Sequence, residues 1–208
     1  MTIYSWPTSG AAFTPSAAPW GQLQNQRVSR SSLNAATQVV SLPGARWLVP
    51  MSFQQQDYAT RAALDAFLVR LSGREHRAAL FHWARPVPRG TCNLAGVTVS
   101  SLAAQFATTV VLTGCGNTKT LLAGDMVGLV TSTGNQLVQV SADATSNAGG
   151  VMTIEVRPLL RGSVAAASAV TLDRPTAQFI LTDDPLVVPY GSGNECPEFT
   201  VNFEEAFP

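Results

Sequence analysis

Short β-forming runs separated by turn residues dominate residues 91–172. This stretch is rich in Val, Thr, Gly, Ala and Ser, and β-like runs occur at residues 96–100, 106–112, 126–130, 137–140 and 152–156. Turn signals lie between these runs, at Gly114-Cys115-Gly116, Gly124-Asp125, Thr133-Gly134-Asn135 and Asn147-Ala148-Gly149-Gly150. Five short strands at this spacing predict a small β-barrel or sandwich.

The flanking segments also have β patterns. Residues 26–53 alternate or are rich in β-branched side chains around the turn signal Pro43-Gly44, which predicts two or three antiparallel strands. Residues 77–83, 177–182 and 199–203 predict further strands, and we expect the last two to pair with the N-terminal sheet. The organisation expected is a discontinuous domain of residues 1–90 plus 173–208, with residues 91–172 inserted as a small β domain. The proline-rich segment 85–90 marks the boundary because proline excludes regular structure.

One amphipathic helix is predicted at residues 58–71. Its apolar residues fall at i, i+3, i+4 and i+7 and share one stripe: Leu64, Phe67, Leu68 and Leu71. Gly73 is well placed to end the helix, and Arg61 and Asp65 form an i,i+4 pair that we place on the exposed side. The stripe predicts that this helix packs against a sheet, so the fold class is mainly β with a minor α part.

The first 20 residues are rich in Pro, Ser, Ala and Gly, with aromatic residues spaced among them. This composition predicts an extended arm anchored by its rings, and we expect a neighbouring subunit to order it. The N-terminus lacks the basic and apolar regions of a secretory signal, which predicts synthesis into the cytoplasm. Apolar runs are much shorter than the roughly 18 residues that a membrane-spanning helix needs, so no membrane insertion is expected.

The net charge of zero hides opposite charges at the two ends of the chain. Residues 1–91 hold nine arginines against three acidic residues, a net charge of +6, whereas residues 173–208 hold one arginine against seven acidic residues, a net charge of −6. The arginines are scattered singly, which disfavours nucleic-acid binding. Chain ends of opposite charge are expected to meet either within one domain or between neighbouring copies in a ring, which favours self-assembly. The predicted inter-subunit contacts join Arg27, Arg30 and Arg46 to Glu204 and Glu205 or to Asp183 and Asp184 of the adjacent copy.

Catalytic chemistry finds little support, and we expect no enzyme activity. The only histidines are His76 and His82, and no local motif joins His82 to a nucleophile and an acid, so a structural His82 is favoured. No phosphate-binding loop and no metal-binding motif occurs, so neither cofactor nor metal is expected. Cys92, Cys115 and Cys196 are interpreted as reduced and mostly buried, while a disulfide between Cys92 and Cys115, which flank one predicted hairpin, stays open.

Several aromatic residues are of the kind that stacks on sugars: Trp47, Tyr58, Trp83 and Tyr190. Core packing is the favoured role for them, because large aromatic side chains usually contribute buried area. A carbohydrate- or receptor-binding module nevertheless stays the alternative to a structural subunit.

Five phrases in a fixed order resemble distal tail or tail-hub proteins of long-tailed, siphovirus-type bacteriophages. They are TQVVSLPGARWL at 37–48, AALDAFLVRLSG at 62–73, FHWARPVPRGT at 81–91, LAGDMVGL at 122–129 and IEVRPLLR at 154–161. The resemblance covers most of the chain, and the order of the phrases carries it rather than any single one.

This resemblance implies a split-barrel or sandwich "belt" domain with one packed helix, and an inserted module that projects outward. It implies a structural subunit of the phage tail tip, assembled in the bacterial host cytoplasm, in a cyclic homo-oligomer that is most often a hexamer. The implied partners are the tail tube protein and the central hub or tip protein, with the tape-measure protein as a further candidate. The family supplies no catalytic residues, and the inserted segment here is small.

Overall fold

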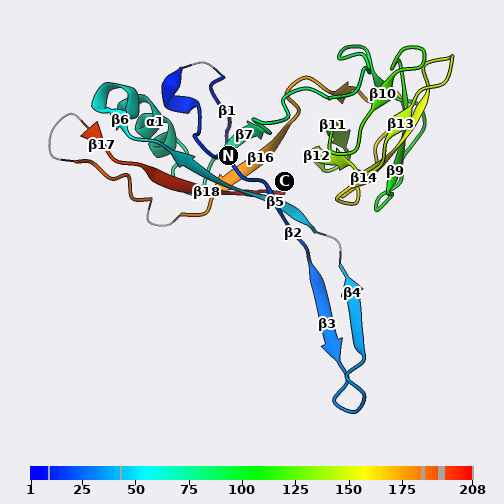
Figure 1. Cartoon of the computed structure of the whole chain (residues 1–208), viewed down its shortest axis with the longest axis horizontal. Coiled ribbons are helices and arrows are strands. Elements are labelled where there is room, and N and C mark those ends of the chain that lie inside the picture. The colour runs from blue at the N-terminus through cyan, green and yellow to red at the C-terminus, as the bar shows by residue number, and fades with distance from the viewer. Residues whose placement is uncertain (9, 43, 184–185, 192–194, 208) are drawn as a thin grey trace. The chain divides into compact units, whose positions relative to one another are not determined.

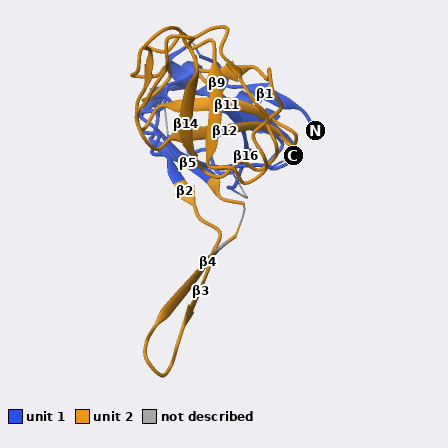
Figure 2. Ribbon diagram, turned by 90° about the vertical axis from the view of Figure 1, so that its right-hand side faces the viewer, with its two compact units in different colours: residues 1–21, 47–83, 176–208 blue, residues 22–46, 84–175 orange. Residues whose placement is uncertain are grey.

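The protein is mainly β in a computed structural model that describes all residues except 9, 43, 184–185, 192–194 and 208. The described chain divides into two compact units (Figure 2). Unit 1 comprises residues 1–21, 47–83 and 176–208, and unit 2 comprises residues 22–46 and 84–175. The chain thus passes from unit 1 to the inserted stretch after residue 83 and returns after residue 175, whereas the sequence placed these changes after residues 90 and 172. Residues 22–46 group with unit 2, which the sequence pattern did not anticipate.

A six-stranded sheet, built mostly from residues of unit 1, has the strand order β1-β7-β16-β18-β5-β2 (Figure 1). Its strands are β1 (Ile3–Ser5), β2 (Gly21–Leu23), β5 (Arg46–Phe53), β7 (Arg77–Phe81), β16 (Thr176–Leu181) and β18 (Phe199–Glu205). β1 runs parallel to β7, and β16 joins β7 to β18 by antiparallel pairing on both sides. The expectation that the last strands join the N-terminal sheet is confirmed, because β18 pairs with β5 over six residues.

One face of this sheet is apolar because buried residues alternate along its strands. In β5 every second residue from Trp47 to Phe53 is buried, and in β18 the same holds from Phe199 to Glu205. Side chains two positions apart point to the same face of a strand, so the alternation places one set against the core. The other set includes partly exposed residues such as Ser52 and Thr200, whose hydroxyl oxygens lie 2.9 Å apart.

The predicted helix is α1 (Tyr58–Arg70), and Leu71 is its C-terminal cap residue. Asp57 caps the first turn, since its Oδ1 accepts a hydrogen bond from the backbone N–H of Thr60 at 3.0 Å. Hydrogen bonding to the side chain of Thr60, and then to its backbone N–H, lowers the pKa of the Asp57 carboxyl. The chain leaves the helix through Gly73, whose φ of +65° is readily adopted by glycine. Of the predicted core stripe, Leu64, Leu68 and Leu71 are buried and Phe67 is half-buried.

The placement of Arg61 on the exposed side of α1 is wrong, because its side chain is 0% exposed. Its Nη2 donates to the backbone oxygens of Gln54 at 3.2 Å and Pro197 at 3.1 Å, and the guanidinium lies 4.2 Å from the ring centroid of Phe199. Burial lowers the pKa of Arg61. The polar side of the helix is therefore covered as well, by the small sheet of β6 (Gln56–Asp57) and β17 (Glu195–Cys196), which contacts α1. Helical periodicity cannot reveal this second cover.

The N-terminal arm is ordered by its own chain, which contradicts the expected role of a neighbouring subunit. Trp6 is only 3% exposed, and its Nε1 donates to the backbone oxygen of Phe13 at 2.9 Å. Its ring centroid lies 5.1–6.3 Å from five other aromatic centroids, those of Phe13, Phe53, Phe67, Trp83 and Phe203. Phe13 belongs to a short 3-10 helix, η1 (Ala11–Phe13), that contacts α1. The rings thus anchor the arm inside unit 1.

Unit 2 contains a nearly closed six-stranded barrel in the order β15-β11-β12-β14-β9-β8. Its strands are β8 (Thr98–Val99), β9 (Thr109–Thr113), β11 (Met126–Thr131), β12 (Gly134–Val140), β14 (Met152–Arg157) and β15 (Val170–Thr171). A β-bridge between Thr98 and Ala169 links β8 to the residue before β15 and so brings the two edges together. All five β-like runs predicted between residues 91 and 172 contain strands. The two-residue strands β10 (Thr120–Leu121), β13 (Ala144–Thr145) and β15 were not predicted.

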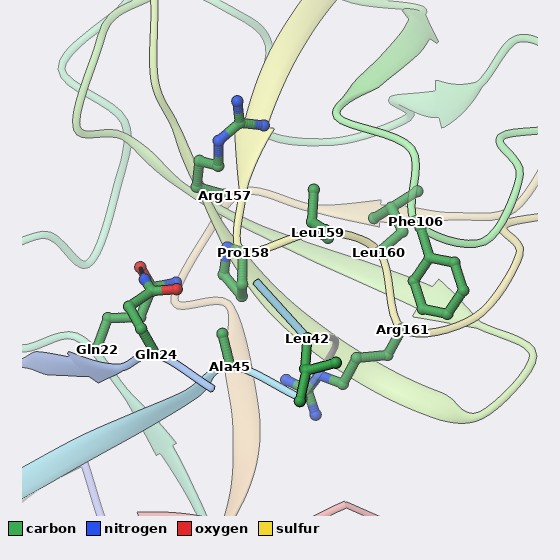
Figure 3. A pocket seen from close by; sticks show the side chains of 11 residues that line it. Gln22, Gln24, Leu42, Ala45, Phe106, Arg157, Pro158, Leu159, Leu160 and Arg161 are labelled. Carbon is green, nitrogen blue, oxygen red and sulfur yellow. Dashed lines mark hydrogen bonds between the residues drawn. The ribbon is translucent and has the colours of Figure 1, made fainter. Parts of the chain in front are cut away.

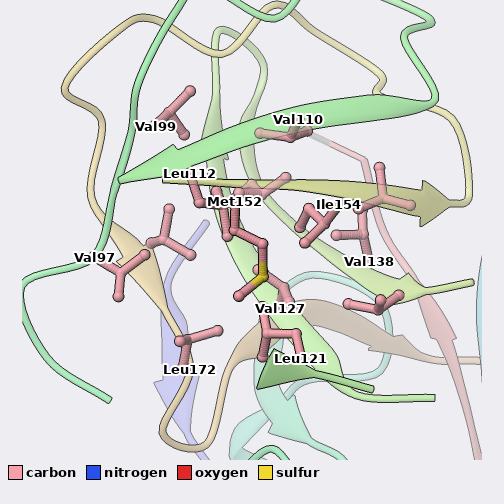
Figure 4. Packing of buried hydrophobic residues seen from close by; sticks show 14 of the residues in the cluster. Val97, Val99, Val110, Leu112, Leu121, Val127, Val138, Met152, Ile154 and Leu172 are labelled. Atoms are coloured by element: carbon pink, nitrogen blue, oxygen red, sulfur yellow. The ribbon is translucent and has the colours of Figure 1, made fainter. Parts of the chain in front are cut away.

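The barrel interior is filled with aliphatic side chains (Figure 4). Leu112, Val138 and Ile154 come from neighbouring strands and are 0% exposed. β14 alternates buried and partly exposed residues from Met152 to Arg157, as a strand with one buried face should. The inserted module therefore has a core of its own.

A buried carboxylate holds the chain where it enters the barrel. Asp125 is 2% exposed and accepts hydrogen bonds from the backbone N–H groups of Arg89 at 2.8 Å, Gly90 at 3.3 Å and Leu122 at 2.8 Å. A side chain at Gly90 would collide with the backbone of Thr120, so glycine is needed for this close approach. The hydrogen bonds of Asp125 thus join the segments FHWARPVPRGT (81–91) and LAGDMVGL (122–129).

Candidate interaction surfaces

The segment before β5 forms a hairpin of β3 (Gln26–Arg30) and β4 (Thr37–Ser41), here called the hairpin arm, residues 23–42 (Figure 1). Every residue from 23 to 40 is exposed. Two antiparallel strands alone are marginally stable in water, because they bury little surface. The ladder has five residue pairs, from Gln26 opposite Ser41 to Arg30 opposite Thr37, and the strands are not covered by a core.

Both faces of the hairpin arm carry valine and arginine side chains. Val28 lies directly opposite Val39, with the Arg30–Thr37 pair two positions further along the same face. Val28 is 65% exposed, a high value for a β-branched apolar residue in a strand. Arg27 lies on the opposite face, across from Val40. Each face therefore presents valine beside arginine.

The tip of the hairpin arm is a compact turn with an apolar end. The N–H of Ser31 donates to the oxygen of Ala36 at 2.9 Å, and the N–H of Ala35 donates to the oxygen of Ser31 at 3.1 Å. The side chain of Asn34 accepts from the N–H of Ala36 at 3.1 Å. Leu33 lies at the apex and is 98% exposed. A defined turn thus presents one fully solvated leucine.

The second surface lies in unit 1 and is here called the acidic face: Asp57, Tyr58, Asp65, Tyr190 and Glu195. Asp57 and Glu195 lie directly opposite each other in the β6–β17 pair. The ring centroids of Tyr58 and Tyr190 are 6.1 Å apart, and the Tyr190 hydroxyl donates to Asp65 Oδ2 at 2.7 Å. That hydrogen bond raises the pKa of Tyr190 to about 12, because it stabilises the protonated phenol beside a carboxylate.

The opposed carboxylates of Asp57 and Glu195 form no ion pair among the described residues, whereas Asp65 interacts electrostatically with the buried guanidinium of Arg61. Two carboxylates directly opposite each other in a strand pair repel, so a cation that approaches Asp57 and Glu195 would stabilise this pair. The hydrogen bond that the structure shows to Glu195 Oε2 comes from a neutral donor, Gln55 Nε2, at 2.7 Å. Both tyrosine rings are exposed. A surface with carboxylates next to exposed aromatic rings suits a guanidinium, because this group can form ion pairs with the carboxylates and stack on the rings.

The seven predicted inter-subunit residues have different environments. Arg27 and Arg30 are exposed on the hairpin arm, and Arg46 is half-buried at the start of β5. Asp183 accepts two hydrogen bonds from Asn202, at 2.8 Å from the backbone N–H and 2.9 Å from Nδ2. Glu204 is half-buried, and Asp184 lies outside the described residues.

Glu205 does not fit the predicted role as a surface charge. It is 1% exposed, and its Oε2 accepts a hydrogen bond from the backbone N–H of Trp47 at 3.1 Å. The alternation of β18 places Glu205 on the core side of the sheet together with Phe203. We therefore leave Glu205 out of the interface. The acidic face itself was missed, because its residues come from distant parts of the sequence and converge only in the fold.

His82 and the three cysteines, which were considered for chemistry, have packed surroundings. The His82 ring stacks on Trp20 at 4.9 Å between centroids. All three cysteines are free and buried. The thiols of Cys92 and Cys115 are hydrogen-bonded to each other, and this bond together with burial raises the pKa of Cys92. Among the described residues, no group of three or more His, Cys, Asp or Glu side chains could hold a metal ion, and no helix could cross a membrane.

A pocket of about 300 Å³ lies within unit 2 (Figure 3). Its walls come from the base of the hairpin arm, including Gln22 and Leu42, and from Phe106 and residues 157–161 of the barrel. Arg157 at its rim pairs with Glu155 at 3.1 Å. The described lining contains neither histidine nor cysteine nor carboxylate, so the pocket does not assemble an acid, a base and a nucleophile.

The aromatic residues considered for sugar stacking separate into two groups. Trp47 is buried, and Trp83 is packed against Trp6 and Phe81. Tyr58 and Tyr190 are exposed and belong to the acidic face. A stacking platform made of all four residues does not exist in this fold.

No protein-family model matches the chain, and no curated protein matches it either.

Proposed function

We propose that this chain is a structural subunit of a phage tail tip, which forms a homo-oligomeric ring between the tail tube and the central hub. The observation that carries the proposal is the hairpin arm, which exposes every residue from 23 to 40, including Val28, Leu33 and Val39. Exposed apolar surface on an uncovered pair of strands marks a protein–protein contact, because water stabilises neither the apolar side chains nor the isolated hairpin.

The order of the five phrases that resemble distal tail proteins supports the particular kind of assembly. The mainly β unit 1 with its packed helix agrees with the belt domain implied by the resemblance, and the barrel of unit 2 agrees with an inserted β module. The tail tube protein and the central hub protein are the proposed partners, with the tape-measure protein as a further candidate. The proposed place of this subunit is the tail tip of the virion, after assembly in the bacterial cytoplasm.

Native mass spectrometry of the purified full-length chain tests the proposal. A closed cyclic oligomer, with six copies expected, supports a ring subunit. A chain that stays monomeric at high protein concentration and low salt would contradict it. Addition of the tail tube protein from the same phage should then give a complex of higher mass, visible as stacked rings by electron microscopy.

A further inference from the structure

We infer that the hairpin arm of one copy docks on the acidic face of the next copy through the side of the hairpin that carries Val28, Val39 and Arg30. This inference rests on the proposed ring and names its interface. The receiving residues are Asp57, Tyr58, Asp65, Tyr190 and Glu195. It replaces the pairing with Glu205 that the sequence suggested.

Charge complementarity is the first argument for a second copy as the occupant. The first 56 residues contain arginines at positions 27, 30 and 46 and no acidic residue, so the hairpin arm is purely cationic. No ion pair to Arg27 or Arg30 is found among the described residues. The acidic face carries three carboxylates. A chain with both surfaces supplies its own complementary partner.

The second argument is the match of apolar and aromatic groups. The Val28–Val39 pair lies two positions from Arg30 on one face of the hairpin arm. The rings of Tyr58 and Tyr190 are exposed beside Asp65. Arginine stacks on tyrosine rings while its nitrogens donate to carboxylates, and valine packs against the remaining ring surface.

The third argument concerns geometry. A hairpin that docks on a different surface of its neighbour makes a head-to-tail contact, in which each copy uses one arm and one face. Such contacts generate a closed ring when the rotation per copy closes, which is the symmetry that the proposed function requires. The same contact would also explain why the arm is an exposed two-stranded element with a defined turn at its tip.

Paired charge reversals in the full-length chain test the inference. R27E/R30E makes the arm acidic, and D65K/E195K makes part of the face basic, while Asp57 is kept because it caps α1. The matched control is K119E/R157E in the barrel, which changes the net charge by the same amount as R27E/R30E. Circular dichroism and thermal unfolding confirm that each variant is folded before its mass is measured.

Each reversal alone should raise the dissociation constant of the oligomer by about tenfold or more, because like charges then face each other. The control should assemble as the wild type does. An equimolar mixture of R27E/R30E and D65K/E195K should recover oligomers in which the two variants alternate, since each arm then meets a face of opposite charge. Isotope labelling of one variant reveals the alternation by mass.

Wild-type assembly should weaken as salt increases, because the Debye length falls from about 10 Å at 0.1 M to about 3 Å at 1 M. Normal rings from both reversed variants would overturn this interface and leave the ring proposal standing. Loss of assembly in both variants without recovery on mixing would also overturn it. A monomeric wild-type chain would overturn the interface and the proposed ring together.

Discussion

Replacement of Trp6 by alanine should destabilise unit 1 more than any other single change in the N-terminal arm. The Trp6 side chain is 3% exposed and touches five aromatic rings. A buried tryptophan removes roughly 200 Å² from water, which at about 25 cal/mol per Å² corresponds to about 5 kcal/mol. Truncations of this kind cost about 3–5 kcal/mol in measured proteins, so we expect a loss in that range.

Trp6→Phe measures the contribution of the indole N–H separately from that of the aromatic ring. Phenylalanine keeps most of the aromatic area but cannot donate to the backbone oxygen of Phe13, a bond of 2.9 Å. The loss of stability in Trp6→Phe should therefore be smaller, about 1–2 kcal/mol, because only one hydrogen bond and a modest amount of packing are lost. Val69→Ala on α1 is the control, because this side chain is 66% exposed and surface changes usually stay within about 0.5 kcal/mol.

Urea unfolding followed by far-ultraviolet circular dichroism gives the stability change, and tryptophan fluorescence is avoided because the substitution removes a fluorophore. Since the chain has two compact units, hydrogen exchange is needed to assign the loss to unit 1. Amides of β1 and β7 should lose protection, whereas those of the barrel should not. A change below about 1 kcal/mol for Trp6→Ala would refute the conclusion that this ring anchors the arm.

Three further predictions follow from buried or coupled groups. Arg61→Met should lower the unfolding free energy of unit 1 by about 1.5–3 kcal/mol in urea titrations, because it removes the charged donor that bonds the backbone oxygens of Gln54 and Pro197; unchanged stability would contradict the role of these bonds. Leu112→Ala should cost about 2–5 kcal/mol by the same assay and reduce exchange protection in the barrel alone, since this side chain is fully buried there. Asp65→Asn should move the Tyr190 pKa from about 12 back toward 10, and ultraviolet titration of the phenol measures this change. In the wild type, the raised pKa of Tyr190 stabilises the fold below pH 10. This contribution to stability is lost as the pH rises through about 12. An unshifted Tyr190 titration in Asp65→Asn would show that the hydrogen bond is not the cause.

The barrel strands could be predicted because their signals are local. Runs such as residues 152–156 alternate apolar and polar side chains, and glycine-rich turns separate them, so pattern and turn chemistry agree. The stripe of α1 is equally local, and Leu64, Leu68 and Leu71 are buried as expected. Two-residue strands such as β10 and β15 carry too few positions for any period to be recognised.

Arg61 and Glu205 were misplaced for the same physical reason. Charged residues are normally exposed, and this expectation was applied to Glu205 although the alternation of its strand places it on the same face as Phe203. Both are buried because segments far away in sequence supply hydrogen-bond partners, Pro197 for Arg61 and Trp47 for Glu205. A buried charge is tolerated only with such partners, and a single sequence does not show which partners the fold will bring.

The sequence by itself determined the mainly β class and the single amphipathic helix. These follow from side-chain periodicity and turn residues, which act over a few neighbouring positions. Only the tertiary structure decided that residues 23–40 are exposed throughout, that Asp57 lies opposite Glu195, and that the ring of Tyr58 lies beside that of Tyr190. Exposure and convergence depend on which distant segments cover a side chain, and hydrophobic packing settles that over the whole unit rather than within any one stretch.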